Sequence, residues 1–159
     1  MSVGPDTQVF SHADTVRCRV DTISGCAVVS ASGDIDLYTT FVLHRAVNAA
    51  LRLSSSLIID LQFVGFVDST GLGVLIAARN RANALGGSVS LVAPPANVRR
   101  LLNGTQLGQH FGVFDTVQEA VGAARTLSRG RQCLHPGPYA ADCGPDWSTV
   151  LMRCRPGAR

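Results

Sequence analysis

The stretch that decides the fold is Phe63-Val64-Gly65-Phe66-Val67-Asp68-Ser69-Thr70-Gly71-Leu72-Gly73-Val74-Leu75. It follows an apolar run at residues 57–61 that is typical of a buried strand, and it leads into residues with helical spacing. Asp, Ser and Thr favour helix N-termini because their oxygens accept hydrogen bonds from the unpaired backbone N–H groups there. The stretch therefore predicts a strand-to-helix junction. The Ser69 hydroxyl would lie near the positive end of the helix dipole, a favourable place for a bound or covalently attached phosphate.

Around this junction, hydrophobic periodicity divides the chain into strands and helices. Alternating apolar residues predict strands, and apolar residues three or four positions apart predict helices. The run at 57–61 is continuously apolar, which is typical of a central strand covered on both faces. The predicted order is ββαβαβαβα, an α/β fold with a mixed central sheet. The expected strands are 15–20, 26–31, 57–61, 88–92 and 110–114, and the expected helices are 41–53, 69–85, 94–104 and 116–126.

The same pattern indicates a single domain with an extension at each end. Residues 1–14 are polar and irregular, and residues 15–126 carry the α/β pattern. Residues 127–159 lose the pattern and contain many Gly and Pro residues. We therefore expect one folded domain at 15–126, preceded by a short N-terminal segment and followed by a poorly ordered tail.

The basic charge is concentrated in the tail. The chain has 14 basic residues, all of them Arg, and 11 acidic residues, for a net charge of +3. Residues 127–159 hold five Arg and two Asp, so the remaining nine Arg and nine acids cancel in residues 1–126. A nucleic-acid-binding domain is expected to carry a basic patch, which argues against that function. No apolar run is long enough to span a bilayer, and the N-terminus is not typical of a signal peptide, so we expect a cytoplasmic protein without a membrane partner.

The five cysteines fall into two groups. Cys18 and Cys26 lie in the first two predicted strands, where we expect them to be neighbouring core residues across a hairpin. Cys133, Cys143 and Cys154 lie in the tail, where they are candidates for a redox-sensitive group. Their spacing lacks the short Cys pair that is typical of zinc sites, so we expect neither a metal nor a cofactor.

The motifs of several enzyme classes are absent. Asp68-Ser69-Thr70-Gly71 has one residue too many for the aspartic protease motif and has no second copy. Val67 stands where a Gly-x-Ser-x-Gly elbow needs its first Gly. A chain without Lys cannot form the Gly-x-x-x-x-Gly-Lys phosphate loop. Ser69 is therefore interpreted as a residue on which another protein acts, in a protein that is not itself an enzyme.

The helix after Ser69 has one apolar face and two aliphatic residues on its polar side. Val74, Leu75, Ala78, Ala82 and Leu85 form one face, which suits contact with the sheet. On the other side, among polar residues, lie Leu72 and Ile76. Two interpretations of this pair stay open: a docking patch beside the serine, or a contact that another helix or the tail covers.

Several of these motifs together resemble a known family. They are Gly33-Asp34-Ile35-Asp36, the strand at 57–61, the run from Phe66 to Leu75, Gly86-Gly87 before a strand, and the stretch that begins with Pro94-Pro95. The domain, at about 15–125, is similar to the STAS domain of anti-sigma factor antagonists, also called anti-anti-sigma factors. Asp34-Ile35 stands where the family often has Glu-Leu, and Thr70 stands where it often has Ser.

The resemblance implies a STAS-type fold and a partner-switching regulator of transcription, as in stress responses. In this scheme the unphosphorylated protein binds an anti-sigma factor, itself a serine kinase, and releases the sigma factor. The kinase switches the antagonist off by phosphorylating the serine after the Asp, which is Ser69 here. An alternative is a STAS sensory or scaffold module that binds a small ligand or senses redox state through its cysteines. Candidate partner-binding residues around Ser69 are Asp34, Asp36, Asp68, Thr70, Gly71, Leu72 and Ile76.

Overall fold

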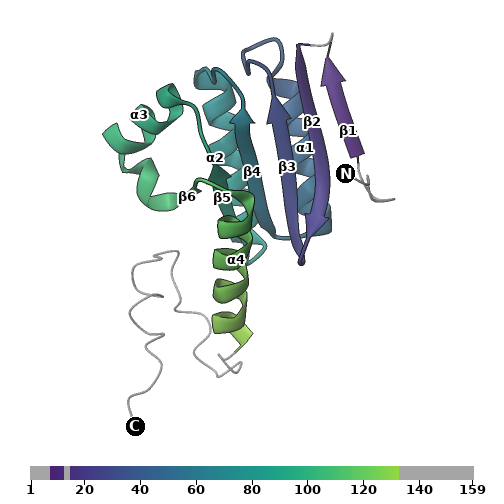
Figure 1. The fold of residues 1–159 in the computed structure, drawn as a ribbon, viewed down its shortest axis with the longest axis vertical. Coiled ribbons are helices and arrows are strands. Elements are labelled where there is room, and N and C mark those ends of the chain that lie inside the picture. The colour runs from purple at the N-terminus through teal and green to yellow at the C-terminus, as the bar shows by residue number, and fades with distance from the viewer. Residues whose placement is uncertain (1–7, 13–14, 133–159) are drawn as a thin grey trace.

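A six-stranded mixed sheet forms the centre of the computed structural model, which describes residues 8–12 and 15–132 (Figure 1). The strands lie side by side in the order β1-β2-β3-β4-β5-β6. The first three pair antiparallel, and the β3–β4, β4–β5 and β5–β6 pairs are parallel. The elements are β1 (Gln8–His12), β2 (Val16–Ile23), β3 (Cys26–Ser32), α1 (Thr40–Leu53), β4 (Ser56–Phe63), α2 (Ser69–Ala84), β5 (Ser88–Val92), α3 (Ala96–Gly104), the 3-10 helix η1 (Gln106–His110), β6 (Gly112–Phe114) and α4 (Val117–Gln132).

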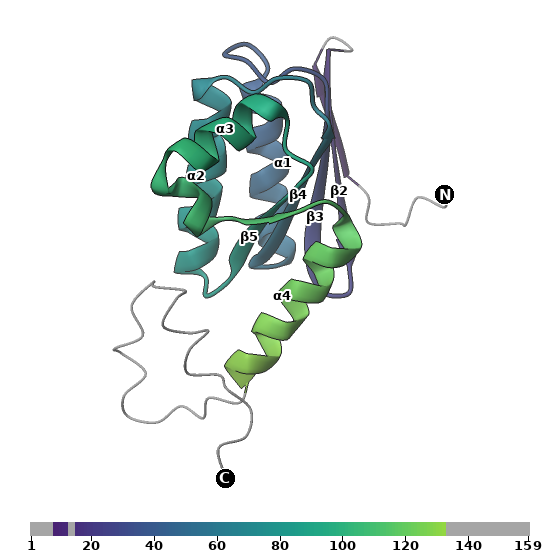
Figure 2. The same ribbon diagram turned by 60° about the vertical axis from the view of Figure 1, so that its left-hand side comes forward.

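Helices cover both faces of the sheet, which explains the continuously apolar β4. Helices α1 and α2 lie on one face and α4 lies on the other (Figures 1 and 2). Leu57, Ile59 and Leu61 of β4 belong to the larger core cluster, which includes residues of α1, α2 and α3. Ile58 points the other way, into a smaller cluster with residues of α4. Successive strand residues thus face opposite layers, and both layers are apolar.

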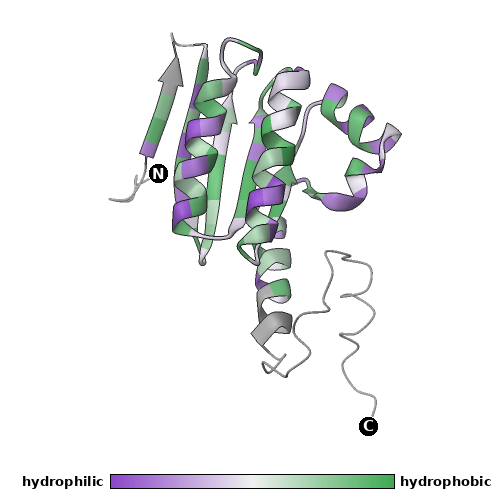
Figure 3. Cartoon of the chain, turned by 180° about the vertical axis from the view of Figure 1, so that it is seen from behind, coloured by the Kyte–Doolittle hydropathy of each residue, from purple (hydrophilic) through white to green (hydrophobic). Residues whose placement is uncertain are grey.

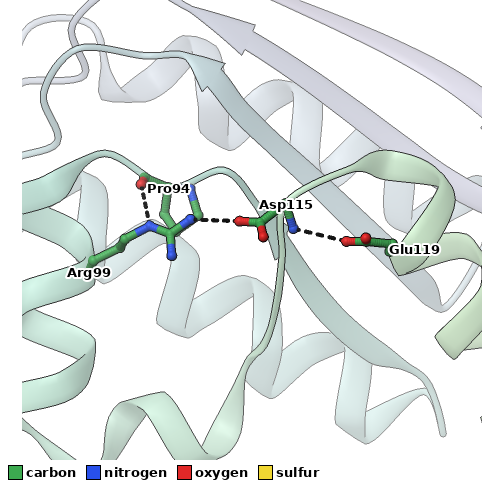
Figure 4. A network of polar contacts seen from close by, with 4 residues as sticks. All are labelled: Pro94, Arg99, Asp115 and Glu119. Atoms are coloured by element: carbon green, nitrogen blue, oxygen red, sulfur yellow. Dashed lines mark hydrogen bonds and ion pairs between the residues drawn. The ribbon is translucent and has the colours of Figure 1, made fainter.

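Polar contacts join α3 to the start of α4. The Arg99 side chain donates from Nε to the Pro94 carbonyl (3.2 Å) and forms an ion pair with Asp115 (3.2 Å). The Asp115 backbone N–H in turn donates to the Glu119 carboxylate (3.2 Å), as Figure 4 shows. The ion pair is exposed, so it contributes little to stability, whereas the Asp115–Glu119 bond, with a bond from the Glu119 N–H to the Thr116 hydroxyl (3.3 Å), caps the start of α4.

The predicted order ββαβαβαβα is confirmed from β2 to α4, with additions at both ends. Strand β1 was not expected, because Gln8–His12 is a short and weakly alternating segment; it forms by pairing with β2, where Phe10 lies opposite Cys18. Helix α4 continues past residue 126 to Gln132, since its Arg and Gln residues favour helix and one Gly costs only about 1 kcal/mol. Residues 133–159, and with them most of the predicted tail, lie outside the described residues.

The expected proximity of Cys18 and Cys26 is wrong. The turn at Ser24-Gly25 places Cys26 opposite Ile23, whereas Cys18 lies opposite Ala31, five strand positions away. The two residues also face different layers: Cys18 belongs to the larger core cluster and Cys26 to the smaller one. Both thiols are free and buried, as the expectation of small core residues requires.

We expect neither thiol to react with an alkylating agent while the domain is folded. Burial raises the pKa of the Cys18 thiol to about 12, and desolvation likewise raises the pKa of Cys26, with Arg125 opposing it. Because the thiolate is the reactive species, raising the pH from 7 to about 9 should leave Cys18 unmodified. Mass spectrometry of peptides after iodoacetamide treatment, with and without urea, measures this protection. Rapid labelling of Cys18 in the folded protein would contradict it.

Candidate functional site

Two loops meet at the end of the sheet where α2 begins. The backbone N–H of Ile35, in the loop after β3, donates to the carbonyl of Phe66 in the loop after β4 (2.9 Å). The Asp68 N–H donates back to the Ile35 carbonyl (3.0 Å), and Ile35 and Val67 form a parallel bridge between these bonds. The loop that carries Asp34 and Asp36 therefore lies directly beside the junction that carries Ser69.

The N-cap of α2 is Asp68, one residue before the candidate phosphorylation site. Its Oδ1 accepts a hydrogen bond from the Gly71 backbone N–H (2.9 Å), a contact typically worth about 1 kcal/mol. Ser69 is the first residue of the helix, and its side chain is exposed. Within the described part of the chain its hydroxyl makes no hydrogen bond, and the same holds for the exposed Thr70. Because Asp68 and not Ser69 caps the helix, the Ser69 oxygen stays exposed and accessible to a phosphoryl donor.

Two glycines allow these segments to pack closely. Gly71 is buried where α2 passes the bridge, and a Cβ atom there would lie 2.6 Å from Val67 Cγ1 and 2.8 Å from Ile35 Cγ2. At Gly65 a Cβ atom would lie 2.8 Å from the Asp34 carboxylate. Gly71, a candidate partner contact from the sequence, is thus covered by the domain's own side chains, and it influences the site by letting α2 approach the bridge.

Asp36 stabilises the turn before α1. Its Oδ1 accepts hydrogen bonds from the backbone N–H groups of Tyr38 (2.8 Å) and Thr39 (3.0 Å), and its own N–H donates to the Thr39 hydroxyl (2.9 Å). Desolvation acts to raise the pKa of Asp36, but these hydrogen bonds outweigh it and hold the pKa below its ordinary value. Asp36 therefore has a structural role in this loop, whereas Asp34 is exposed.

Leu72 and Ile76 lie on the flank of α2 that faces away from α1. On the other flank, Arg81 donates a hydrogen bond to Asn48 of α1. Both aliphatic residues are half-buried and pack against the larger core cluster, so the domain covers part of each.

The sheet-facing side of α2 differs from the expectation at one position, Leu85. Gly71, Leu75, Ala78 and Ala82 are buried, and Val74 is half-buried. The prediction that Leu85 lies on this face is wrong, because Leu85 is the C-cap residue and is 58% exposed. The helix ends one residue earlier than its apolar pattern, so the Leu85 side chain leaves the sheet.

Large exposed apolar side chains lie in or next to the two loops that meet at the junction, and sequence reasoning did not identify them as an interaction surface. Phe63 (71% exposed) is the last residue of β4, and Phe66 (49%) lies in the loop between β4 and Ser69. Leu37 (66%), Tyr38 (77%) and Phe41 (44%) follow Asp36 in the neighbouring loop and first turn of α1. We call these five residues the apolar rim. Their signal in the sequence is that large apolar residues stand in or next to the two connecting loops, and exposed apolar patches often mark interaction sites.

Asn97 connects α3 to the junction and was also missed from the sequence. Its Nδ2 donates to the Val67 carbonyl (2.6 Å), and its Oδ1 is buried without a hydrogen-bond partner among the residues that the structure describes. The residue immediately before Asp68 is therefore held from two sides, by Ile35 and by Asn97.

The described residues contain no group of three or more His, Cys, Asp or Glu side chains that could hold a metal ion. None of the helices in residues 15–132 is long and apolar enough to cross a membrane. Cys133, Cys143 and Cys154, the candidates for a redox role, lie outside the described residues.

Comparisons with known proteins identify the class. Residues 17–120 match the STAS domain family, and the chain therefore belongs to that family. The chain is 32% identical over 119 residues to the anti-sigma-F factor antagonist RsfB of Mycobacterium tuberculosis, in an alignment that covers 73% of this chain and 95% of RsfB.

Solved structures agree with this assignment. An anti-sigma factor antagonist from Mycobacterium paratuberculosis superposes with a TM-score of 0.64 at 33% identity, covering 72% of this chain and 98% of the other. The Bacillus cell fate determinant SpoIIAA in its phosphorylated form superposes with a TM-score of 0.56, covering 67% of this chain and 97% of the other. Its 18% identity shows the shared fold alone.

Proposed function

We propose that this chain is an anti-sigma factor antagonist that is switched off by phosphorylation of Ser69. The relatives from the two Mycobacterium species, each about one-third identical over nearly their full length, support the class. The observation that carries the phosphorylation proposal is the state of Ser69: exposed, without a hydrogen bond in the described part of the chain, and at the first position of a helix that Asp68 already caps.

The proposed partner is an anti-sigma factor that is also a serine kinase. The surface that would meet it comprises the apolar rim together with the exposed Asp34 and Thr70. Leu72 and Ile76 would contribute their exposed parts, while Asp36, Asp68 and Gly71 would shape this surface by stabilising its turns and the close approach of α2. An apolar surface with a few polar groups is typical of the centre of a protein–protein interface.

Phosphorylation would act on this surface directly. A phosphate adds about 1.5 to 2 negative charges at pH 7, one residue from the Asp68 carboxylate. The N-terminus of α2 stabilises an anion within the free protein. In the complex the same charge would have to be desolvated beside apolar side chains, which is costly unless the partner neutralises it. Phosphorylation is therefore expected to prevent docking with little change to the fold.

Phosphate mapping tests the proposal. The full chain is incubated with Mg-ATP and each serine-kinase anti-sigma factor of the source organism, and the phosphorylated peptide is sequenced by mass spectrometry. We expect one phosphate, on Ser69, and none in a Ser69→Ala variant. Thr70→Ala is the matched control, because Thr70 is adjacent and also exposed; it should be phosphorylated like the original chain. Phosphate on Thr70, or none with any of these kinases, would contradict the proposal.

A further inference from the structure

An apolar cleft lies at the β6 edge of the sheet, away from Ser69. Its volume is about 430 Å³, within the range of small ligand pockets. Residues of α2, β5, η1, β6 and α4, with Phe111 between η1 and β6, form its walls, and the apolar ones are Val89, Phe111, Phe114, Ala123 and Leu127. No Asp, Glu, Lys or Arg is among the lining residues that the structure describes.

The cleft reaches the opposite end of α2 from the phosphorylation site. Asn83 lines it and lies 14 residues after Ser69, about 21 Å along a helix that rises about 1.5 Å per residue. An occupant of the cleft would therefore leave the surface around Ser69 open. Among the described strands, β6 is the edge of the sheet and has only three residues, whereas α4 has 16.

The chain continues directly from the wall of this cleft. Ala123, Thr126 and Leu127 of α4 line it, and α4 ends at Gln132, after which 27 residues follow. Within them, residues 147–152 read Trp-Ser-Thr-Val-Leu-Met, a segment without charge or Pro that contains the only Trp of the chain. The other uncharged stretch, near Tyr139, carries Pro136 and Pro138. An uncharged apolar segment matches an uncharged apolar cleft, and Trp fills such clefts effectively.

We propose that residues 147–152 bind this cleft within the same molecule, with Trp147 against its apolar wall. The 14 residues between Gln132 and Trp147 span roughly 20 Å if they behave as a flexible linker, which is enough to fold back along α4. Such a linker also gives an effective concentration in the millimolar range, so even a weak contact would be well populated. The proposal does not depend on the function of Ser69.

Fluorescence of the single Trp in the full chain tests the proposal. We expect the emission maximum of the folded protein at a shorter wavelength than that of the urea-unfolded chain, and reduced quenching by iodide. A Thr126→Arg variant places a long charged side chain at an exposed position on the cleft wall. It should move the emission to the unfolded position and restore quenching, while circular dichroism stays unchanged.

Gln118→Arg is the matched control, because Gln118 is exposed on the same helix but does not line the cleft. It should leave the emission unchanged. Emission of the original chain at the unfolded position would overturn the proposal, as would a short-wavelength emission that Thr126→Arg does not move. Loss of the short-wavelength emission on dilution would identify a second copy as the occupant and would also overturn binding within one molecule.

Discussion

A Ser69→Asp variant is expected to bind its anti-sigma factor roughly 100-fold more weakly than the original chain, a loss of about 2.7 kcal/mol. The new carboxylate would lie in the first turn of α2, next to Asp68 and after the loop that carries Phe66 of the apolar rim. Complex formation would then have to remove water from two adjacent negative charges, which an apolar partner surface cannot compensate. Isothermal titration calorimetry with the purified anti-sigma factor measures the change.

Ser69→Ala provides the control for this result. It removes a hydroxyl that makes no hydrogen bond in the described part of the chain and that does not cap α2, so folding and binding should change little. With ATP present, the original chain should lose binding over time, and Ser69→Ala should keep it. If Ser69→Asp binds as tightly as Ser69→Ala, the switch does not operate through charge at this position.

Gly71→Ala is expected to lower the free energy of unfolding by roughly 1–3 kcal/mol, the range for overpacking a core. The added methyl group would lie 2.6 Å from Val67 Cγ1 and 2.8 Å from Ile35 Cγ2. Both neighbours are β-branched residues with few alternative side-chain conformations, and both are fully buried. The start of α2 would therefore have to move away from the bridge and carry Ser69 with it. Urea denaturation measures the stability, and partner binding reports the displacement.

Gly73→Ala, two residues further along the same helix, is the matched control. Apart from the chain neighbours and the backbone of the helix itself, no heavy atom of the described residues lies within 4 Å of a Cβ at this exposed position. Replacing a helical Gly by Ala without a clash should stabilise the protein by about 0.5–1 kcal/mol. Opposite signs for the two substitutions would assign the cost at Gly71 to the contact with Ile35 and Val67. Equal effects would show that this contact is not tight.

Most of the fold could be predicted because each periodic segment faces a continuous apolar layer. The run in β4 indicated burial on both faces, and the structure places Ile58 in one cluster and Ile59 in the other. The junction was equally predictable, since Asp68 and the residues after it carry both a cap and the start of a helical pattern. Local sequence suffices where a few neighbouring residues determine the hydrogen bonds.

The remaining features depend on contacts between distant segments. Strand β1 exists because β2 offers an edge, and the register of the β2–β3 hairpin separates Cys18 from Cys26. The contact between Asn97 and the Val67 carbonyl joins residues 30 positions apart. The exposure of the apolar rim depends on the tertiary positions of the two loops. The residue pattern within each loop does not predict those positions.

The helix cap is Asp68 and not Ser69, which bears on whether the domain stays folded through repeated phosphorylation. A serine that held the helix would weaken the domain each time a phosphate was added or removed. Here Asp68 caps the helix, and the proposed phosphorylation site is the next residue, Ser69. Under the proposed switch, one molecule would pass through repeated phosphorylation and dephosphorylation as a folded domain, and its recovery would not require refolding.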